Sequence, residues 1–140
     1  MREILFKAKR ADNGEWVTGY YIKSIAEGSV FGYIRESILG TDIKIMLNTL
    51  CQYTGLKDKN GNLIWENDIV KCVDINAETE FFAVVEFGNP NGFYSWGYQL
   101  KHIYGDEPNL DILLWVDMDE AGATCEVIGN IFDNTELINE

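Results

Sequence analysis

The stretch that decides the fold runs from Thr49 to Val73 and reads TLCQYTGLKDKNGNLIWENDIVKCV. An extended segment enters a polar turn at Asn60-Gly61, and an apolar run returns from it. Asn-Gly is a strong hairpin signal, because both residues tolerate the positive φ that a type I′ turn requires. A second turn follows, in which we expect the Asp68 carboxylate to accept backbone N–H bonds before a new strand begins. This stretch therefore predicts a structural hairpin with Asn60, Gly61 and Asp68 at its turns.

Short extended segments recur along the rest of the chain. Alternating or β-branched and aromatic residues predict strands over residues 2–9, 15–22, 29–34, 42–47, 69–73, 80–87, 93–98 and 124–128. Turn signals about eight to twelve residues apart are typical of an all-β barrel or sandwich. We predict a small antiparallel barrel or sandwich with one or two short helical turns. The strand that begins at Asp68 favours an SH3-like barrel by analogy.

Four places along the chain are less sharply specified. Gly19 lies inside a predicted strand, which indicates a bulge or a close backbone approach. Residues 99–109 give no clear signal for a helix or a strand, and residues 110–116 fit either one. Near the end of the chain, Asn134 or Thr135 is placed to cap a short helical turn.

A chain of 140 residues fits one domain. We predict a single mostly β domain over residues 1–140, with an N-terminal hairpin region (1–48) and a region holding the central hairpin and barrel core (49–140). The sequence contains no run of about 18 apolar residues, so it predicts no membrane span. The first residues alternate polar and apolar side chains and lack the apolar core of a secretion signal, so we expect a cytoplasmic location.

The formal net charge of −12 is unevenly distributed. Residues 1–50 carry +1, residues 51–100 carry −4 and residues 101–140 carry −9. Binding to a phosphate backbone requires the opposite sign, so we expect no direct binding to nucleic acid. The acidic residues either keep a small domain soluble or face a protein partner with a basic surface, including by mimicry of nucleic acid.

The sequence offers no catalytic residues, metal ligands or cofactor motif. We expect the three cysteines, Cys51, Cys72 and Cys125, to be reduced core residues, because no two of them form a zinc-type pair. His102 is the only histidine and has no nucleophile motif near it. The acidic segment 117–128 resembles a calcium loop only in part, because its fifth position is Ala and its twelfth is Ile. We therefore expect no cofactor and no metal.

The central stretch contains Gln52-Tyr53-Thr54-Gly55-Leu56-Lys57-Asp58-Lys59-Asn60-Gly61, followed by Ile64, Glu66 and Asp68-Ile69-Val70. This run is the most specific of three segments that resemble the phage and prophage YopX-like proteins. The opening, residues 4–8 and 14–20, and the close, residues 126–134, also resemble that family, whereas residues 75–123 match loosely. The resemblance implies a small, mostly β protein encoded by a phage or prophage. It implies no established activity and transfers no catalytic residues.

These observations favour a non-enzymatic accessory protein that acts through protein contacts in the cytoplasm of a bacterial host. The candidate interaction surface comprises Lys57, Asp58, Lys59, Asn60, Trp65 and Trp96. One alternative is a homo-oligomeric structural protein whose edge strands and aromatic residues form subunit contacts. The other is an enzyme or metal-binding protein with a site built from scattered carboxylates. The aromatic strand 93–98 lacks the nearby cations of a base-stacking surface, which favours core packing or a protein interface.

Overall fold

The computed structural model describes residues 4–37, 39–88, 91–92, 97–106, 109–117 and 122–138. Strand accounts for 58% of the structure and helix for 9%, so the all-β prediction is confirmed. The SH3-like barrel is not confirmed. Where one domain was predicted, with a regional boundary after residue 48, the structure forms two compact units, Met1–Gly55 and Leu56–Glu140.

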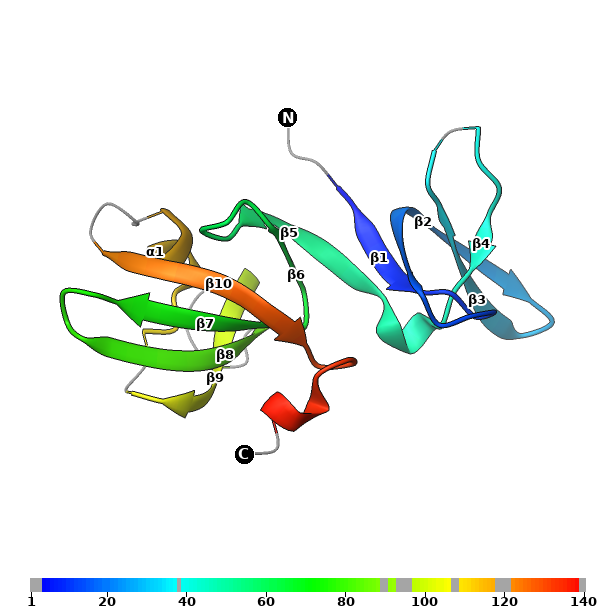
Figure 1. Cartoon of the computed structure of the whole chain (residues 1–140). Helices are drawn as coiled ribbons and strands as arrows, with labels where there is room; N and C mark the ends of the chain where they lie inside the picture. Colours follow the sequence, from blue (N-terminus) through cyan, green and yellow to red (C-terminus); the bar gives the residue numbers. More distant parts are fainter. Residues whose placement is uncertain are drawn as a thin grey trace. The chain divides into compact units, whose positions relative to one another are not determined.

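The first unit is built on antiparallel strands (Figure 1). Its elements are β1 (Phe6–Lys9), β2 (Trp16–Ala26), β3 (Ser29–Arg35), β4 (Ile43–Lys44), the 3-10 turn η1 (Leu47–Thr49) and β5 (Cys51–Lys57). The six-stranded sheet has the order β4-β3-β2-β1-β5-β6. The last two residues of β5, and β6 (Leu63–Trp65), belong to the second unit. Compared with the predictions, the strand expected over 15–22 extends further, to Ala26, and the strand expected over 42–47 is shorter, Ile43–Lys44.

One face of the first unit's sheet forms its core. Ala8, Val17, Ile34 and Ile45 are fully or almost fully buried there, because alternate residues of a strand point to the same side. Gly19 is buried in β2, and a Cβ atom at this position would collide with the backbone carbonyl of Arg35. The prediction of a close backbone approach at Gly19 is confirmed.

The second unit holds a four-stranded antiparallel sheet of order β10-β7-β8-β9 (Figure 1). Its further elements are β7 (Asp68–Asp74), β8 (Thr79–Gly88), β9 (Gly97–Gly105), the helix α1 (Ile112–Asp117), β10 (Ala123–Asn130) and the 3-10 turn η3 (Thr135–Leu137). The ambiguous segment 110–116 is thus mostly helix, and the weakly specified segment 99–109 holds most of β9. Residues 93–96 of the predicted aromatic strand lie outside the described residues.

The core of the second unit lies between one face of this sheet and α1. The ring of Phe81 on β8 meets that of Trp115 on α1 edge to face, with 5.2 Å between ring centroids. The indole Nε1 of Trp115 donates to the carbonyl oxygen of Asn109 at 2.7 Å, so this buried donor is paired. The apolar run 112–116 therefore folds as a helix that places Ile112 and Trp115 in the core and leaves Leu113 exposed.

The three cysteines are buried free thiols, as predicted. Cys51 lies in the first unit, whereas Cys72 on β7 and Cys125 on β10 lie directly opposite each other in the second. The carbonyl of Cys125 accepts from the backbone N–H of Lys59, so it points away from β7. The two cysteines therefore form the closely spaced, non-hydrogen-bonded kind of antiparallel pair.

Among the described residues, no helix combines the length and the apolar character needed to cross a membrane.

Candidate functional site

The central turn is a three-residue hairpin loop rather than the predicted type I′ turn. The backbone N–H of Gly61 donates to the carbonyl of Asp58 at 3.0 Å, and the N–H of Asp58 donates to the carbonyl of Asn62 at 2.8 Å. Gly61 has a φ of +82°, whereas Asn60 has a negative φ. A type I turn followed by a left-handed glycine meets this description, and a type I′ turn requires positive φ at both central residues. The type I′ prediction is therefore wrong, and the need for glycine at position 61 stands.

The carboxylate of Asp58 organises this loop from inside. It accepts the backbone N–H bonds of Asn60 at 3.0 Å and Asn62 at 2.9 Å through one oxygen, and that of Val127 on β10 at 2.9 Å through the other. Burial opposes the charged form, but these hydrogen bonds outweigh it and lower the pKa of Asp58 below its ordinary value. The central hairpin is thereby attached to the last strand of the second unit's sheet.

The six candidate interaction residues were expected to be exposed, and the structure shows that only some of them are. Lys57, Lys59 and Asn60 are exposed, as expected. Asp58 and Trp65 are buried, with exposed fractions of 7% and 8%, so neither side chain contributes to an exposed surface. Sequence reasoning placed Asp58 outside because a charged residue in a polar turn is usually solvated. Trp96 lies outside the described residues.

Asp68 has the structural role that was predicted for it. It is 2% exposed, and its carboxylate accepts the backbone N–H of Trp65 at 2.8 Å. Between them Asn67 adopts a φ of +73°, which closes the tight turn from β6 into β7. The two aspartates of the central stretch, Asp58 and Asp68, therefore both stabilise turns and are unavailable for acid–base chemistry at an open surface.

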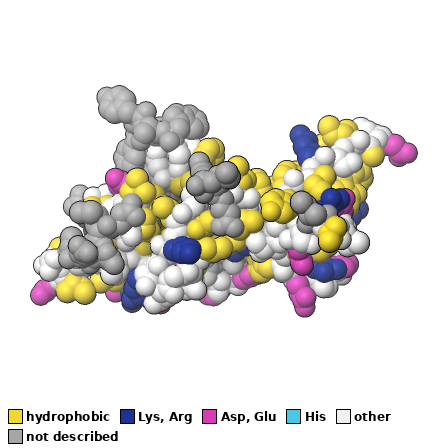
Figure 2. Space-filling view, turned by 90° about the horizontal axis from the view of Figure 1, so that it is seen from above, with side chains coloured by type: hydrophobic (Ala, Val, Ile, Leu, Met, Phe, Trp, Pro, Cys, Tyr) yellow, Lys and Arg dark blue, Asp and Glu magenta, His cyan; other side chains and the backbone are white. Residues whose placement is uncertain are grey.

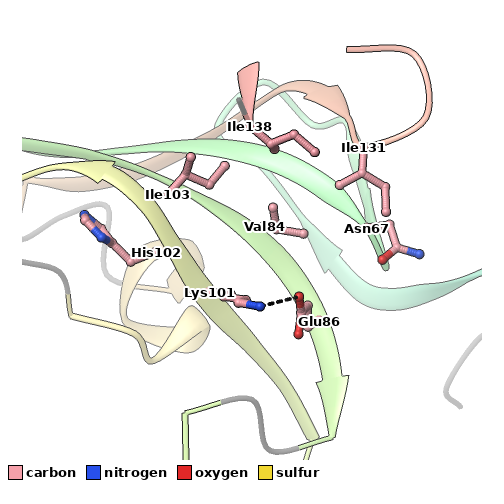
Figure 3. A pocket seen from close by; sticks show the side chains of 8 residues that line it. All are labelled: Asn67, Val84, Glu86, Lys101, His102, Ile103, Ile131 and Ile138. Carbon is pink, nitrogen blue, oxygen red and sulfur yellow. Dashed lines mark ion pairs between the residues drawn. The ribbon is translucent and has the colours of Figure 1, made fainter. Parts of the chain in front are cut away.

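A groove of about 390 Å³ lies on the second unit, on the side of β8 and β9 that faces the C-terminal segment (Figure 3). Val84, Ile103, Ile131 and Ile138 give it an apolar lining. Its polar lining comprises Asn67, His102 and the ion pair of Lys101 with Glu86, whose Nζ and Oε1 atoms are 3.8 Å apart. The ring of His102 points away from the isoleucines in Figure 3, and it lies 6.0 Å from the ring of Phe81. The described residues make the groove a mostly apolar depression, and the one carboxylate among them is paired with a lysine.

A second surface feature lies on the first unit, on the face of its sheet opposite to the core. The strand registers pair Lys9 with Trp16, Tyr20 with Arg35 and Tyr33 with Lys44, so these side chains share that face. We call this surface the basic-aromatic face. Its members are Lys7, Lys9, Trp16, Thr18, Tyr20, Ile22, Ser24, Phe31, Tyr33, Arg35 and Lys44. None of them is acidic, because the acids among the described residues of the first unit lie in turns and loops between its strands.

Cations lie directly over the aromatic rings of the basic-aromatic face. The Nζ atoms of Lys7 and Lys9 are 4.6 and 5.5 Å from the centroid of the Trp16 ring. On the neighbouring strands, Nζ of Lys44 lies 5.0 Å from the ring of Phe31. The right of the space-filling view shows basic, hydrophobic and acidic side chains of the first unit (Figure 2). Alternation within the predicted strand 15–22 is enough to place Trp16 and Tyr20 on one side, but the lysines of other strands join them only through the sheet register.

The comparisons with known proteins agree with this architecture. Residues 5–139 match the family model described as "YopX protein". A crystal structure of protein EF1440 from Enterococcus faecalis is similar to this chain at 23% sequence identity and a TM-score of 0.50. The similarity covers 99% of this chain and 100% of that one, and at this identity it shows the fold alone. None of the curated proteins compared with this chain matches it.

Proposed function

Because the chain belongs to the YopX protein family, we propose that it is a phage- or prophage-encoded accessory protein that binds another protein. It acts without catalysis, in the cytoplasm of the bacterial host, and its second unit presents an acidic surface to a partner with a basic face. Solubility alone requires a net charge well away from zero but no particular distribution of it.

The observation that carries this proposal is the division of charge between the two units. Residues 56–140 hold four Lys/Arg and seventeen Asp/Glu, whereas residues 1–55 hold seven and six. Three of the four cations of the second unit lie in ion pairs, Lys59 with Glu126, Lys71 with Glu80 and Lys101 with Glu86. The acidic surplus of the second unit therefore creates a field that attracts basic partners and repels polyanions.

The groove of the second unit gives little support to the enzyme alternative. General acid–base work needs a titratable group within hydrogen-bond reach of a substrate in a site that excludes water. Among the described residues that line it, the only carboxylate, that of Glu86, is paired with Lys101, and the rest of the lining is mostly apolar. A protein-binding role is the better account of the molecule's surface.

Affinity capture from phage-infected host extract tests the proposal. The full chain is immobilised and washed at low and at high salt, beside an unrelated protein of equal net charge. We expect reproducible enrichment of a basic protein that is released by high salt, because exposed charge pairs are screened. Equal recovery on the control protein would contradict the proposal.

A further inference from the structure

We propose that the basic-aromatic face of the first unit binds the acidic second unit of another copy of this chain, so that copies associate head to tail. The inference rests on the proposed function and identifies a partner with a basic face for the acidic second unit. The acidic second unit requires a basic face, and the chain itself carries one.

The aromatic residues of the basic-aromatic face are of the kind enriched at protein interfaces. Aromatic residues and cations dominate this face, and Tyr20 at its centre is 56% exposed. Aromatic side chains and arginine are enriched where proteins meet, and tyrosine and tryptophan bury a large area at a small cost in conformational entropy. No member of this face is acidic, and Arg35 is paired with Asp42 of the loop before β4 at 2.7 Å, so Lys7, Lys9 and Lys44 carry most of its positive charge. A carboxylate-rich surface is its electrostatic complement.

The rings of Trp16 and Phe31 on this face favour carboxylates over nucleic acid bases. Base recognition on a sheet requires open aromatic faces on which bases stack. The ring of Trp16 lies under Lys7 and Lys9, and that of Phe31 lies under Lys44. A carboxylate can bind these ammonium groups without displacing them from the rings, whereas a stacking base would have to displace them. The field of the second unit also repels a polyanion.

The charges of the chain identify a second copy as the occupant. The second unit has a formal balance of four cations against seventeen acids, and every copy supplies it at the same concentration as the basic-aromatic face. The two surfaces differ, so the contact is heterologous. Such contacts produce rings when the rotation closes and open chains when it does not. We therefore expect oligomers larger than a dimer.

Sedimentation velocity of the full chain at increasing concentration tests the inference. At 50 mM salt we expect the mean mass to rise with concentration, and at 500 mM salt we expect the monomer. Lys44→Glu places an acid on the basic-aromatic face and should weaken association about tenfold or more, since like charges at an interface are strongly unfavourable. Tyr20→Ser should also weaken it.

Lys23→Glu is the matched control. Lys23 lies on β2 opposite Gly32, and a Cβ atom at Gly32 would point at Ile45 and Leu47 on the core side of the sheet. The side chain of Lys23 is therefore on the core side and not on the basic-aromatic face. The Lys23→Glu variant has the same change in charge as Lys44→Glu and should associate like the wild type. Monomer at every concentration at 50 mM salt, or an equal effect of Lys23→Glu and Lys44→Glu, would overturn the inference.

A mixing experiment distinguishes head-to-tail association from contact between two identical faces. A labelled Lys44→Glu chain keeps its acidic second unit and should join wild-type oligomers as a terminal copy, which shortens them. Failure to join would show a face-to-face contact and overturn the inference. Saturable binding of single-stranded DNA that Lys44→Glu abolishes and Lys23→Glu spares would also overturn it. These results leave the proposed function intact if a basic host protein is still captured, so the two failures are distinguishable.

Discussion

The carboxylate of Asp58 accepts the backbone N–H of Val127 at 2.9 Å, although the two residues are 69 positions apart in the chain. Val127 lies on β10, where alternate residues direct their backbone N–H and carbonyl groups away from β7. The N–H of Lys59 donates to the carbonyl of Cys125 at 3.0 Å on the same side. The turn of the central hairpin is therefore fixed to the edge of the second unit's sheet by both its side chain and its backbone.

Asp58→Ala is expected to lower the free energy of unfolding by about 2–4 kcal/mol, because it leaves buried backbone donors without an acceptor. Thermal or urea unfolding of the full chain measures this change. Lys59→Ala is the matched control, since Lys59 is exposed and its ion pair with Glu126 is long at 3.5 Å. It should change stability by about 0.5 kcal/mol or less. Equal effects of the two substitutions would show that the carboxylate does not hold the turn.

The pKa of Asp58 gives its contribution a defined dependence on pH. Hydrogen bonds from Val127, Asn62 and Asn60 outweigh the opposing effect of burial and lower the pKa in the folded state. A group whose pKa is lowered in the folded state stabilises the fold fully when the pH is above its pKa in the unfolded chain, about 3.9 for aspartate. This stabilisation is lost as the pH falls through the pKa of the folded state. The difference in stability between the wild type and Asp58→Asn should therefore be constant from pH 7 to about pH 5 and shrink below about pH 4. A difference that grew on acidification would contradict the lowered pKa.

Gly61→Val is expected to destabilise the protein by about 1–2 kcal/mol or more, because a β-branched residue is strained in the left-handed region. Gly61 has a φ of +82°, and no atom lies within 4 Å of the position that a Cβ would take, so the cost is conformational rather than steric crowding. Gly61→Asn is the comparison, since asparagine tolerates positive φ, and it should cost less. Equal melting temperatures of Gly61→Val and the wild type would refute the expected strain.

The central hairpin shows how far sequence reasoning reaches and where it ends. Asn60-Gly61 predicted the position of the turn and the need for glycine, because these are properties of a few adjacent residues. The turn type was missed, although Asp58 three residues before Gly61 is a local signal for a type I turn, and only the bond to Val127 lies beyond the local sequence. The segment 110–116 fitted both a strand and a helix because its state depends on tertiary contacts. Its helical state depends on Trp115 packing against Phe81, a contact that no local pattern contains.

The basic-aromatic face likewise combines features that the local sequence predicts with features that only the sheet register shows. Trp16 and Tyr20 could be assigned to one side of a strand from their spacing alone. Lys44 joins them only because β4 pairs with β3 in a register that places it opposite Tyr33. The net charge of residues 1–50, +1, likewise could not show that basic side chains gather on one face of the sheet. Pairing partners and register depend on long-range contacts, so the basic-aromatic face could not be predicted from composition.

Gly19→Ala is expected to destabilise the first unit severely, by about 3 kcal/mol or more, because overpacking forces a backbone shift. The added methyl group would collide with the carbonyl of Arg35, which is backbone and cannot rotate away. Gly14→Ala is the matched control in the preceding turn, where no atom lies within 4 Å of the Cβ position, and should cost only the strain of its positive φ. Thermal unfolding measures both variants, and a smaller loss for Gly19→Ala than for Gly14→Ala would refute the close approach.

The thiols of Cys51, Cys72 and Cys125 should be inert in the folded protein. All three are 1% exposed or less. The hydrogen bond between the side chains of Cys72 and Cys125, together with burial, raises the pKa of Cys72 well above its ordinary value. The thiolate is the reactive form, so raising the pH to about 9 should accelerate alkylation of Cys72 far less than that of a free cysteine. Iodoacetamide labelling followed by mass spectrometry checks this, with full labelling in denaturant as the control. Rapid labelling of Cys72 in the native state at pH 7 would show that β7 and β10 separate readily, contrary to the tight pairing of these strands.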